Sequence, residues 1–314
     1  MTLARDEAEL EDLGGGLFAY VQGDGSWGLS NAGLVTDGEE SLLIDTLFDL
    51  PRTRRMLDAM ARATPAARKI NTVVNTHANG DHCYGNELVA DARIIASTAS
   101  AEEMQEVTPD LMAAMLKGAD EMGDAGRFLR KAFGAFEFEG IKLTPPTETF
   151  DGRLDLRVGD HAVELIEVGP AHTRGDVIIH VPGSRAVFTG DILFIEGTPI
   201  MWAGPVANWI DACEKIVALE PDVIVPGHGP LTDVRGTLAV RDYLVYIRDE
   251  ARKRYDAGLS AREAALDIRL GDYSAWLDSE RIAVNVMTLY REFGDTSPPP
   301  GPLEMFELMA LLDQ

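Results

Sequence analysis

The sequence predicts an α/β protein, and two observations support this fold class. Short apolar runs with the spacing of strands recur in both halves of the chain, near residues 18–46 and 154–189. Each set is followed by a segment of helical spacing and then by a short buried strand, so the second half repeats the order of the first. We expect one α/β domain over residues 1–235, a helical insertion near 98–136, and a helical C-terminal extension, 236–314, packed on that domain.

The first half begins with strands joined by tight turns. Asp37-Gly38 marks one hairpin, since this dipeptide suits the left-handed conformation that short hairpin turns need. Residues 52–63 have helical spacing, with Leu57, Met60 and Ala61 on one face. The strands expected around these features span residues 18–22, 32–35, 41–45 and 70–74.

The insertion near residues 98–136 is rich in methionine. Met104, Met112, Met115 and Met122 recur there near helical spacing. A methionine-lined helical pair would suit an adaptable lid over a substrate pocket. Methionines on a helix also serve as core residues or as a dimer contact, so three interpretations stay open at this point.

Strand spacing returns after the insertion, and a helical region ends the chain. The expected elements are strands at 154–158, 162–168, 176–181, 185–189 and 223–225, and a helix at 207–219. After Gly236 the chain is helical to about Glu292, breaks at the proline-rich residues 297–302, and ends in the apolar stretch 303–312. This last helix is expected to dock on its own subunit or on a second copy, which would make a homodimer.

Composition excludes several function classes. The chain has 52 acidic and 28 basic residues, and its formal net charge of −24 repels phosphate backbones and anionic membranes. No run approaches the ~18 apolar residues of a membrane span, and the acidic residues 1–10 lack the apolar core of a leader. The cysteines, Cys83 and Cys213, show no pairing pattern. We expect a cytoplasmic protein that binds a small-molecule substrate, with no nucleic-acid or membrane partner.

The most informative segment follows the buried strand at 70–74. It reads Asn75-Thr-His-Ala-Asn-Gly-Asp-His-Cys-Tyr-Gly-Asn86 and places His77, Asp81 and His82 within six residues. Loops after strand ends are where sites in α/β sheets form, and Gly80 is expected to let this loop turn tightly. Imidazoles and a carboxylate on one turn are typical ligands of a divalent metal ion.

Three further polar motifs follow strand-like runs downstream. They contain His172, Asp191 and His228, each close to glycine or proline. Four of the six histidines thus lie in strand-end motifs, which chance placement would rarely produce. The sequence therefore predicts a single metal centre that these motifs share.

These motifs resemble the metallo-β-lactamase superfamily, whose signature H-x-H-x-D-H is followed by a histidine, an aspartate and a final histidine. The resemblance runs from about residue 18 to 229 and implies an αββα sandwich with the site at one edge. It implies that a metal-bound hydroxide, oriented by Asp81, attacks an ester-like bond in a lactone, thioester, β-lactam or related small molecule. The implied ligands are His77, position 79 and His172 for a first metal, Asp81, His82 and His228 for a second, and Asp191 as the bridge.

The chain departs from this signature at Asn79, which replaces the second histidine. An amide oxygen is a weaker ligand than imidazole for zinc-like ions, so we expect the first metal position to be weak or empty. The second position keeps all its ligands. We therefore expect one or two zinc ions, with iron or manganese as alternatives. Asn79 is also a catalytic candidate, because its N–H groups could donate to a developing oxyanion.

Four further residues near these motifs have expected roles. Asp176 lies four residues after His172, where it would hold a ligand imidazole by its second ring nitrogen or else cap the following strand. Trp27 and Tyr84 are expected to line the substrate pocket, although tryptophan is equally common in packing. Cys83 is expected to be a small buried residue.

Two other functions stay open. One is an iron-dependent redox enzyme, because flavodiiron proteins and persulfide dioxygenases of the same fold use related ligand sets. The other is a non-catalytic relative, suggested by Asn79 and by the long helical additions. Metal analysis separates the redox enzyme from the other two functions. A panel of esters and lactones separates an enzyme from a non-catalytic relative.

Overall fold

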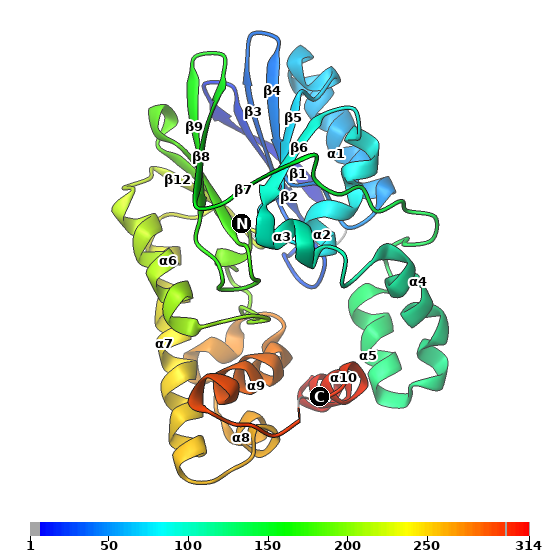
Figure 1. The fold of residues 1–314 in the computed structure, drawn as a ribbon, viewed down its shortest axis with the longest axis vertical. Coiled ribbons are helices and arrows are strands. Elements are labelled where there is room, and N and C mark those ends of the chain that lie inside the picture. Colours follow the sequence, from blue (N-terminus) through cyan, green and yellow to red (C-terminus); the bar gives the residue numbers. More distant parts are fainter. Residues whose placement is uncertain (1–6, 299, 314) are drawn as a thin grey trace.

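The computed structural model describes residues 7–298 and 300–313 of the chain. Two β-sheets pack face to face, and helices cover the outer face of each sheet (Figure 1). The first six residues and Pro299, which belongs to the expected proline-rich break, lie outside the described residues.

The first sheet has seven strands in the described part of the chain, and they lie in sequence order. Neighbouring strands are antiparallel from β1 to β4 and parallel from β4 to β7. Its strands are β1 (Ala8–Gly14), β2 (Leu17–Gln22), β3 (Ala32–Asp37), β4 (Glu40–Ile44), β5 (Thr72–Val74), β6 (Arg93–Ser97) and β7 (Glu148–Phe150).

The second sheet has five described strands in the order β12-β11-β10-β9-β8. All neighbours are antiparallel except β11 and β12, which are parallel. Its strands are β8 (Arg153–Val158), β9 (His161–Glu167), β10 (Val177–Val181), β11 (Ala186–Phe188) and β12 (Val223–Val225).

The alternation of side chains along the strands builds the layers. In β4, Leu42 and Ile44 join a core between the sheets that includes Ile179 of the second sheet. Leu43 points to the opposite face and packs with Met56 of α1 (Leu50–Ala63). This helix begins at the Asp49 cap, whose side chain accepts a hydrogen bond from the backbone of Arg52.

The outer face of the second sheet is covered in the same way. Ile178 and Val187 share a buried cluster with Trp209 of α6 (Val206–Ala218) and Leu244 of α7 (Val234–Asp256). The order of layers is therefore helix, sheet, sheet, helix. This confirms the predicted αββα sandwich.

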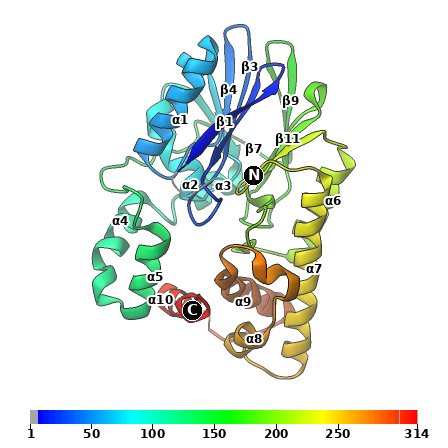
Figure 2. The ribbon, with the colours of Figure 1, turned by 180° about the vertical axis from the view of Figure 1, so that it is seen from behind.

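The helical additions lie together at one end of the sandwich, where α5 packs beside α10 (Figures 1 and 2). The rings of Phe128 and Phe306 join these two helices, with centroids 6.1 Å apart. Met104 and Met112 of the insertion are buried, which agrees with their interpretation as core residues. The remaining helices of the described chain are α2 (Gly80–Cys83), α3 (Thr98–Glu103), α4 (Pro109–Gly118), α5 (Gly123–Phe133), α8 (Ala261–Asp267), α9 (Ile282–Phe293) and α10 (Pro302–Leu312).

Three strands, β1, β6 and β7, were not predicted from the sequence. β1 is mostly exposed and lacks the apolar alternation of a half-buried strand. In β7 only the last of its three residues, Phe150, is buried, and β6 is a buried five-residue strand to which no strand was assigned from the sequence. No helix among the described residues combines the length and apolarity that a membrane span requires. The domain division after residue 235 stays a prediction.

Candidate metal centre

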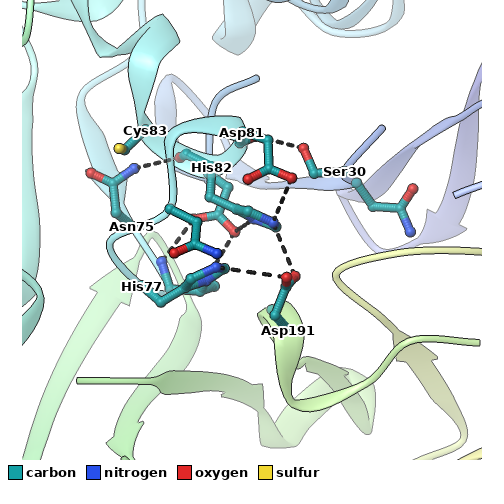
Figure 3. A network of polar contacts seen from close by, with 12 residues as sticks. Ser30, Asn75, His77, Asp81, His82, Cys83 and Asp191 are labelled. Atoms are coloured by element: carbon teal, nitrogen blue, oxygen red, sulfur yellow. Dashed lines mark hydrogen bonds and ion pairs between the residues drawn. The ribbon is translucent and has the colours of Figure 1, made fainter. Parts of the chain in front are cut away.

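The predicted ligands meet at one edge of the sandwich, where strands of both sheets end. His77 lies in the loop after β5, Asp81 and His82 lie in the short helix α2 that follows, and Asp191 lies in a 3-10 turn (Gly190–Ile192) just after β11. Figure 3 shows His77, Asp81 and His82 on one segment and Asp191 approaching them from another. The structure brings all six predicted ligands together: His77, Asp81, His82, His172, Asp191 and His228.

The Asp191 carboxylate lies at the centre of this group. Its Oδ1 lies 3.0 Å from His82 Nε2. Its Oδ2 lies 3.8, 3.4 and 3.4 Å from the Nε2 atoms of His77, His172 and His228. One carboxylate therefore faces four imidazoles, as a ligand shared by two metal positions would.

Asp191 can lie there because its neighbours leave room. A Cβ atom at Gly227 would lie 2.0 Å from Asp191 Oδ1, so any side chain at 227 would displace the carboxylate. Gly190 has a φ of +50°, in the left-handed region that favours glycine. Glycine is therefore needed at positions 190 and 227 for the Asp191 carboxylate to take this place.

Each ligand histidine is held from outside through its Nδ1 atom. The four partners are Thr76 Oγ1 for His77 at 2.9 Å, Asp45 Oδ2 for His82 at 2.9 Å, the Ile200 carbonyl for His172 at 2.6 Å and the Gly25 carbonyl for His228 at 3.1 Å. All four rings therefore present Nε2 to the centre. Such outer hydrogen bonds fix the orientation of metal-binding histidines.

Asp45 orients two of the histidines, and the sequence analysis missed it. Its Oδ2 accepts hydrogen bonds from His82 Nδ1 and from Thr76 Oγ1, the latter at 2.7 Å. Because the Thr76 hydroxyl donates to Asp45, it can accept from His77 Nδ1. The available signal was an aspartate directly after β4, the strand that pairs in parallel with β5.

Unpaired polar atoms show that the centre suits a metal ion. His77 Nε2 is buried without a hydrogen-bond partner, and His82 Nε2 and Asp191 Oδ1 face each other without hydrogen-bond geometry. Buried polar atoms without partners are costly. Among the described residues, two groups could hold a metal ion, His77 with His82 and Asp191, and Asp81 with His82 and His228. Imidazole nitrogens and carboxylate oxygens are the donors that zinc takes.

The buried charges divide the histidines into two kinds. Burial lowers the pKa of His172 to about 4 and, with the charge of His82, that of His77 well below its usual range. Burial would also lower the pKa of His228, but Asp191 outweighs it and raises this pKa to about 9. Without a metal, His228 thus carries a proton that a bound cation would replace.

Asn79 contacts the ligating nitrogen of His172. Its Nδ2 lies 3.1 Å from His172 Nε2. Because His172 donates from Nδ1 to the Ile200 carbonyl, its Nε2 carries the lone pair and accepts from the Asn79 amide. This hydrogen bond occupies the lone pair that a metal ion in the first position would need.

The prediction that Asp176 holds a ligand imidazole is wrong. Both carboxylate oxygens accept from the backbone N–H of Thr173, and Oδ1 also accepts from the Thr173 hydroxyl at 2.6 Å. Asp176 closes the turn before β10, which is the alternative capping role, and Ile200 holds His172 instead.

The prediction that Tyr84 lines the pocket is also wrong. Tyr84 is 1% exposed, and its hydroxyl donates to the Val107 carbonyl. A Cβ at Gly80 would lie 2.4 Å from the Tyr84 ring, so Gly80 makes room for this ring within the α2 helix. Cys83 is buried as predicted.

Trp27 lies between the insertion and the C-terminal extension. Its indole N–H donates to Glu280 Oε1 at 2.7 Å, and its ring contacts Phe128 and Phe133 of α5. The loop that carries Trp27 also reaches the centre through the Gly25 carbonyl. Contact between Trp27 and a substrate stays a prediction.

The comparison with known families agrees with this geometry. Residues 25–228, from the loop that carries Trp27 to the last ligand, match the metallo-β-lactamase superfamily. The protein belongs to the metallo-β-lactamase superfamily.

Several curated proteins are similar to this chain in sequence. The chain is 22% identical over 271 residues to a linear primary-alkylsulfatase of Pseudomonas sp., covering 77% of this chain and 50% of the relative. It is 24% identical over 204 residues to the 2,4-dinitroanisole O-demethylase subunit alpha of Nocardioides sp., with 62% and 51% covered. It is 25% identical over 211 residues to the human acyl-coenzyme A thioesterase MBLAC2, covering 63% of this chain and 72% of the relative. The chain spans about half the length of the first two relatives.

Solved structures of the superfamily share the fold. The stereoselective inverting sec-alkylsulfatase Pisa1 from Pseudomonas sp. aligns with a TM-score of 0.68 at 18% identity, covering 93% of this chain and 51% of that one. The DIM-1 metallo-β-lactamase aligns with a TM-score of 0.55 at 17% identity, covering 76% and 98%. At these identities the likeness shows the fold alone.

Proposed function

We propose that the protein is a metallo-hydrolase that cleaves an ester-like bond in a small molecule and uses a single zinc ion. The observation that carries this proposal is the convergence of four Nε2 atoms, each ring held from outside, on the Asp191 carboxylate. Such an array is prepared for a cation before the cation arrives, so little reorganisation opposes binding.

The second metal position is the better site for this ion. Asp81, His82 and His228 supply one ligand atom each, and Asp191 lies beside them as a fourth donor. The first position keeps His77 and His172, but the Asn79 amide donates to the nitrogen of His172 that would bind there. A metal at the first position would have to break that hydrogen bond.

A divalent ion at this site would lower the pKa of a bound water to about 7 and polarise the bond under attack. The Asp81 carboxylate is more exposed than that of Asp191, with 12% of its side chain accessible against 3%. It is therefore placed to orient the attacking water. Asn79 has two N–H groups, and His172 takes one of them. The second is free to donate to the negative charge that develops on the substrate.

This chemistry supports one substrate class. A carbonyl or related electrophile with a good leaving group suits an attacking water beside a cation. The names of the relatives, an alkylsulfatase and an acyl-coenzyme A thioesterase, support an ester-like bond. Lactones, thioesters, β-lactams and sulfate esters form the panel to test.

We expect zinc-loaded protein to hydrolyse at least one class in this panel. Removal of the metal by a chelator should lower that activity by at least about 100-fold, and one equivalent of zinc should restore it. The His228→Ala variant, which lacks a ligand, should not be restored. Activity that survives chelation, or zinc-loaded protein inert to every class, would contradict the proposal.

A further inference from the structure

We infer that the C-terminal extension helps to position a ligand of the metal centre. Its residues Arg281 and Glu280 hold His228 in place through Phe194 and Trp27. No motif points to either residue. The inference rests on the proposed function in one respect, that the centre binds a metal ion. Two chains of contact lead from the extension to the His228 ring.

The first chain runs through Phe194. The Phe194 and His228 rings are stacked, with centroids 5.0 Å apart and planes 8° apart. The backbones of the two residues also form a bridge, and the N–H of Ile195 donates to the His228 carbonyl at 3.0 Å. Phe194 is 1% exposed, so its ring is enclosed by other side chains. The face of His228 is therefore fixed by Phe194.

The second chain runs through the loop that carries Trp27. The Gly25 carbonyl in this loop accepts the hydrogen bond from His228 Nδ1 at 3.1 Å. Gly25 packs directly on the chain after the ligand, since a Cβ there would lie 2.3 Å from the Gly229 nitrogen. Displacement of this loop would thus free the His228 ring to rotate.

Arg281 joins the two chains. Its guanidinium carbon lies 4.3 Å from the centroid of the Trp27 ring and 5.1 Å from that of Phe194. The same group donates to the Thr198 carbonyl at 2.9 Å and pairs with Asp278 at 2.8 Å. Arg281 is 1% exposed. A planar cation held by one hydrogen bond and one ion pair can stack on both rings, which the flexible ammonium of lysine cannot reproduce.

Glu280 and Asn285 complete the connection. Glu280 accepts the indole N–H of Trp27 at 2.7 Å, which fixes the ring that Arg281 covers. Asn285 of α9 donates a hydrogen bond to the carbonyl of Pro199 and accepts one from the N–H of Met201, each at 2.8 Å. Between them lies Ile200, whose carbonyl holds His172. The extension therefore supports the outer partners of two ligand histidines.

The test is the dissociation constant for Zn²⁺ alone, measured on the full chain by competition with a chromophoric chelator. Arg281→Lys keeps the positive charge but loses the stacked plane, and we expect it to weaken zinc binding by about 10- to 100-fold. Phe194→Leu keeps an apolar side chain beside Arg281 and should show a loss in the same direction. It also replaces Arg281→Lys if that variant does not fold.

The matched control is Arg252→Lys. Arg252 lies in the same extension and over two aromatic rings, Tyr255 at 5.4 Å and Phe293 at 5.2 Å, and its ion-pair partner is Asp256, which is not a metal ligand. Its zinc affinity should stay within about twofold of wild type. Affinities of Arg281→Lys and Phe194→Leu within that same range, even with lowered unfolding temperatures of the metal-free proteins, would overturn the inference alone. A wild type that binds no zinc would overturn the proposed function and the inference together.

Discussion

Asp191→Asn is expected to weaken zinc binding by at least about 100-fold and to remove the hydrolytic activity with it. The loss should exceed the 10- to 100-fold typical of outer partners, because Asp191 faces the cation directly. Its two oxygens lie within 3.8 Å of four imidazole nitrogens, so it is the common ligand of the centre. Asparagine is neutral and presents N–H groups on one side, where they would point at ligand atoms. Chelator competition measures the affinity.

The matched control for this variant is Asp176→Asn. Asp176 is as buried as Asp191, but its oxygens contact Thr173 and no ligand histidine. Burial raises the pKa of Asp176 to about 8, whereas the facing histidines hold the pKa of Asp191 well below its usual range, so a neutral amide changes the charge less at position 176 than at position 191. Its zinc affinity should stay within about twofold of wild type. Near-normal zinc binding by Asp191→Asn would contradict the assignment of Asp191 as the shared ligand.

Asp45→Asn is expected to weaken zinc binding by about 10- to 100-fold, although Asp45 does not face the metal position. Asp45 accepts three hydrogen bonds, from His82 Nδ1 and from the N–H and the hydroxyl of Thr76. Asparagine offers one acceptor oxygen and two N–H donors, so at least one of these donors would meet another donor. The His82 ring and, through Thr76, the His77 ring would lose their orientation.

The Asp45→Asn result separates orientation from stability. Zinc affinity and the unfolding temperature of the metal-free protein are measured on the same samples, with Asp176→Asn again as the buried-carboxylate control. A variant that unfolds earlier but binds zinc as tightly as wild type would show that Asp45 only stabilises the fold. Reduced affinity at a temperature where the metal-free variant is fully folded is the expected result.

The ligands could be predicted from the sequence because they lie in short motifs that directly follow strands. His77, Asp81 and His82 lie within six consecutive residues, and His228 comes three residues after β12. The role of Asp45 could not be predicted from the sequence, because an aspartate after a strand is common. Its role appears only when β4 pairs with β5 and places it beside Thr76.

The wrong expectations concern partners that are distant in sequence. Asp176 was expected beside His172 because it is four residues away, but the Ile200 carbonyl, 28 residues away, takes that place. Tyr84 lies two residues after the ligand His82, yet the helical turn places its ring against Gly80 in the core. Arg281 lies 53 residues beyond His228, and nothing in the local sequence marks it as a neighbour of the centre.

The sandwich itself was predictable because buried strands and helices have regular spacing. β2, β3 and β4 are almost entirely buried, and α1 presents Met56 and Met60 from one face. How the insertion and the extension meet was not predictable, since the contact of Phe128 with Phe306 joins segments far apart in the chain.

The most direct test of a single-metal centre is the metal content per chain, measured by plasma mass spectrometry on protein purified without added metal. Wild type and Asn79→His are compared. We predict about one zinc per chain in wild type and a rise toward two in Asn79→His, because imidazole would supply the missing ligand beside His172. Two equivalents of iron in wild type would contradict the account and favour redox chemistry, and the absence of any bound metal would favour a non-catalytic relative.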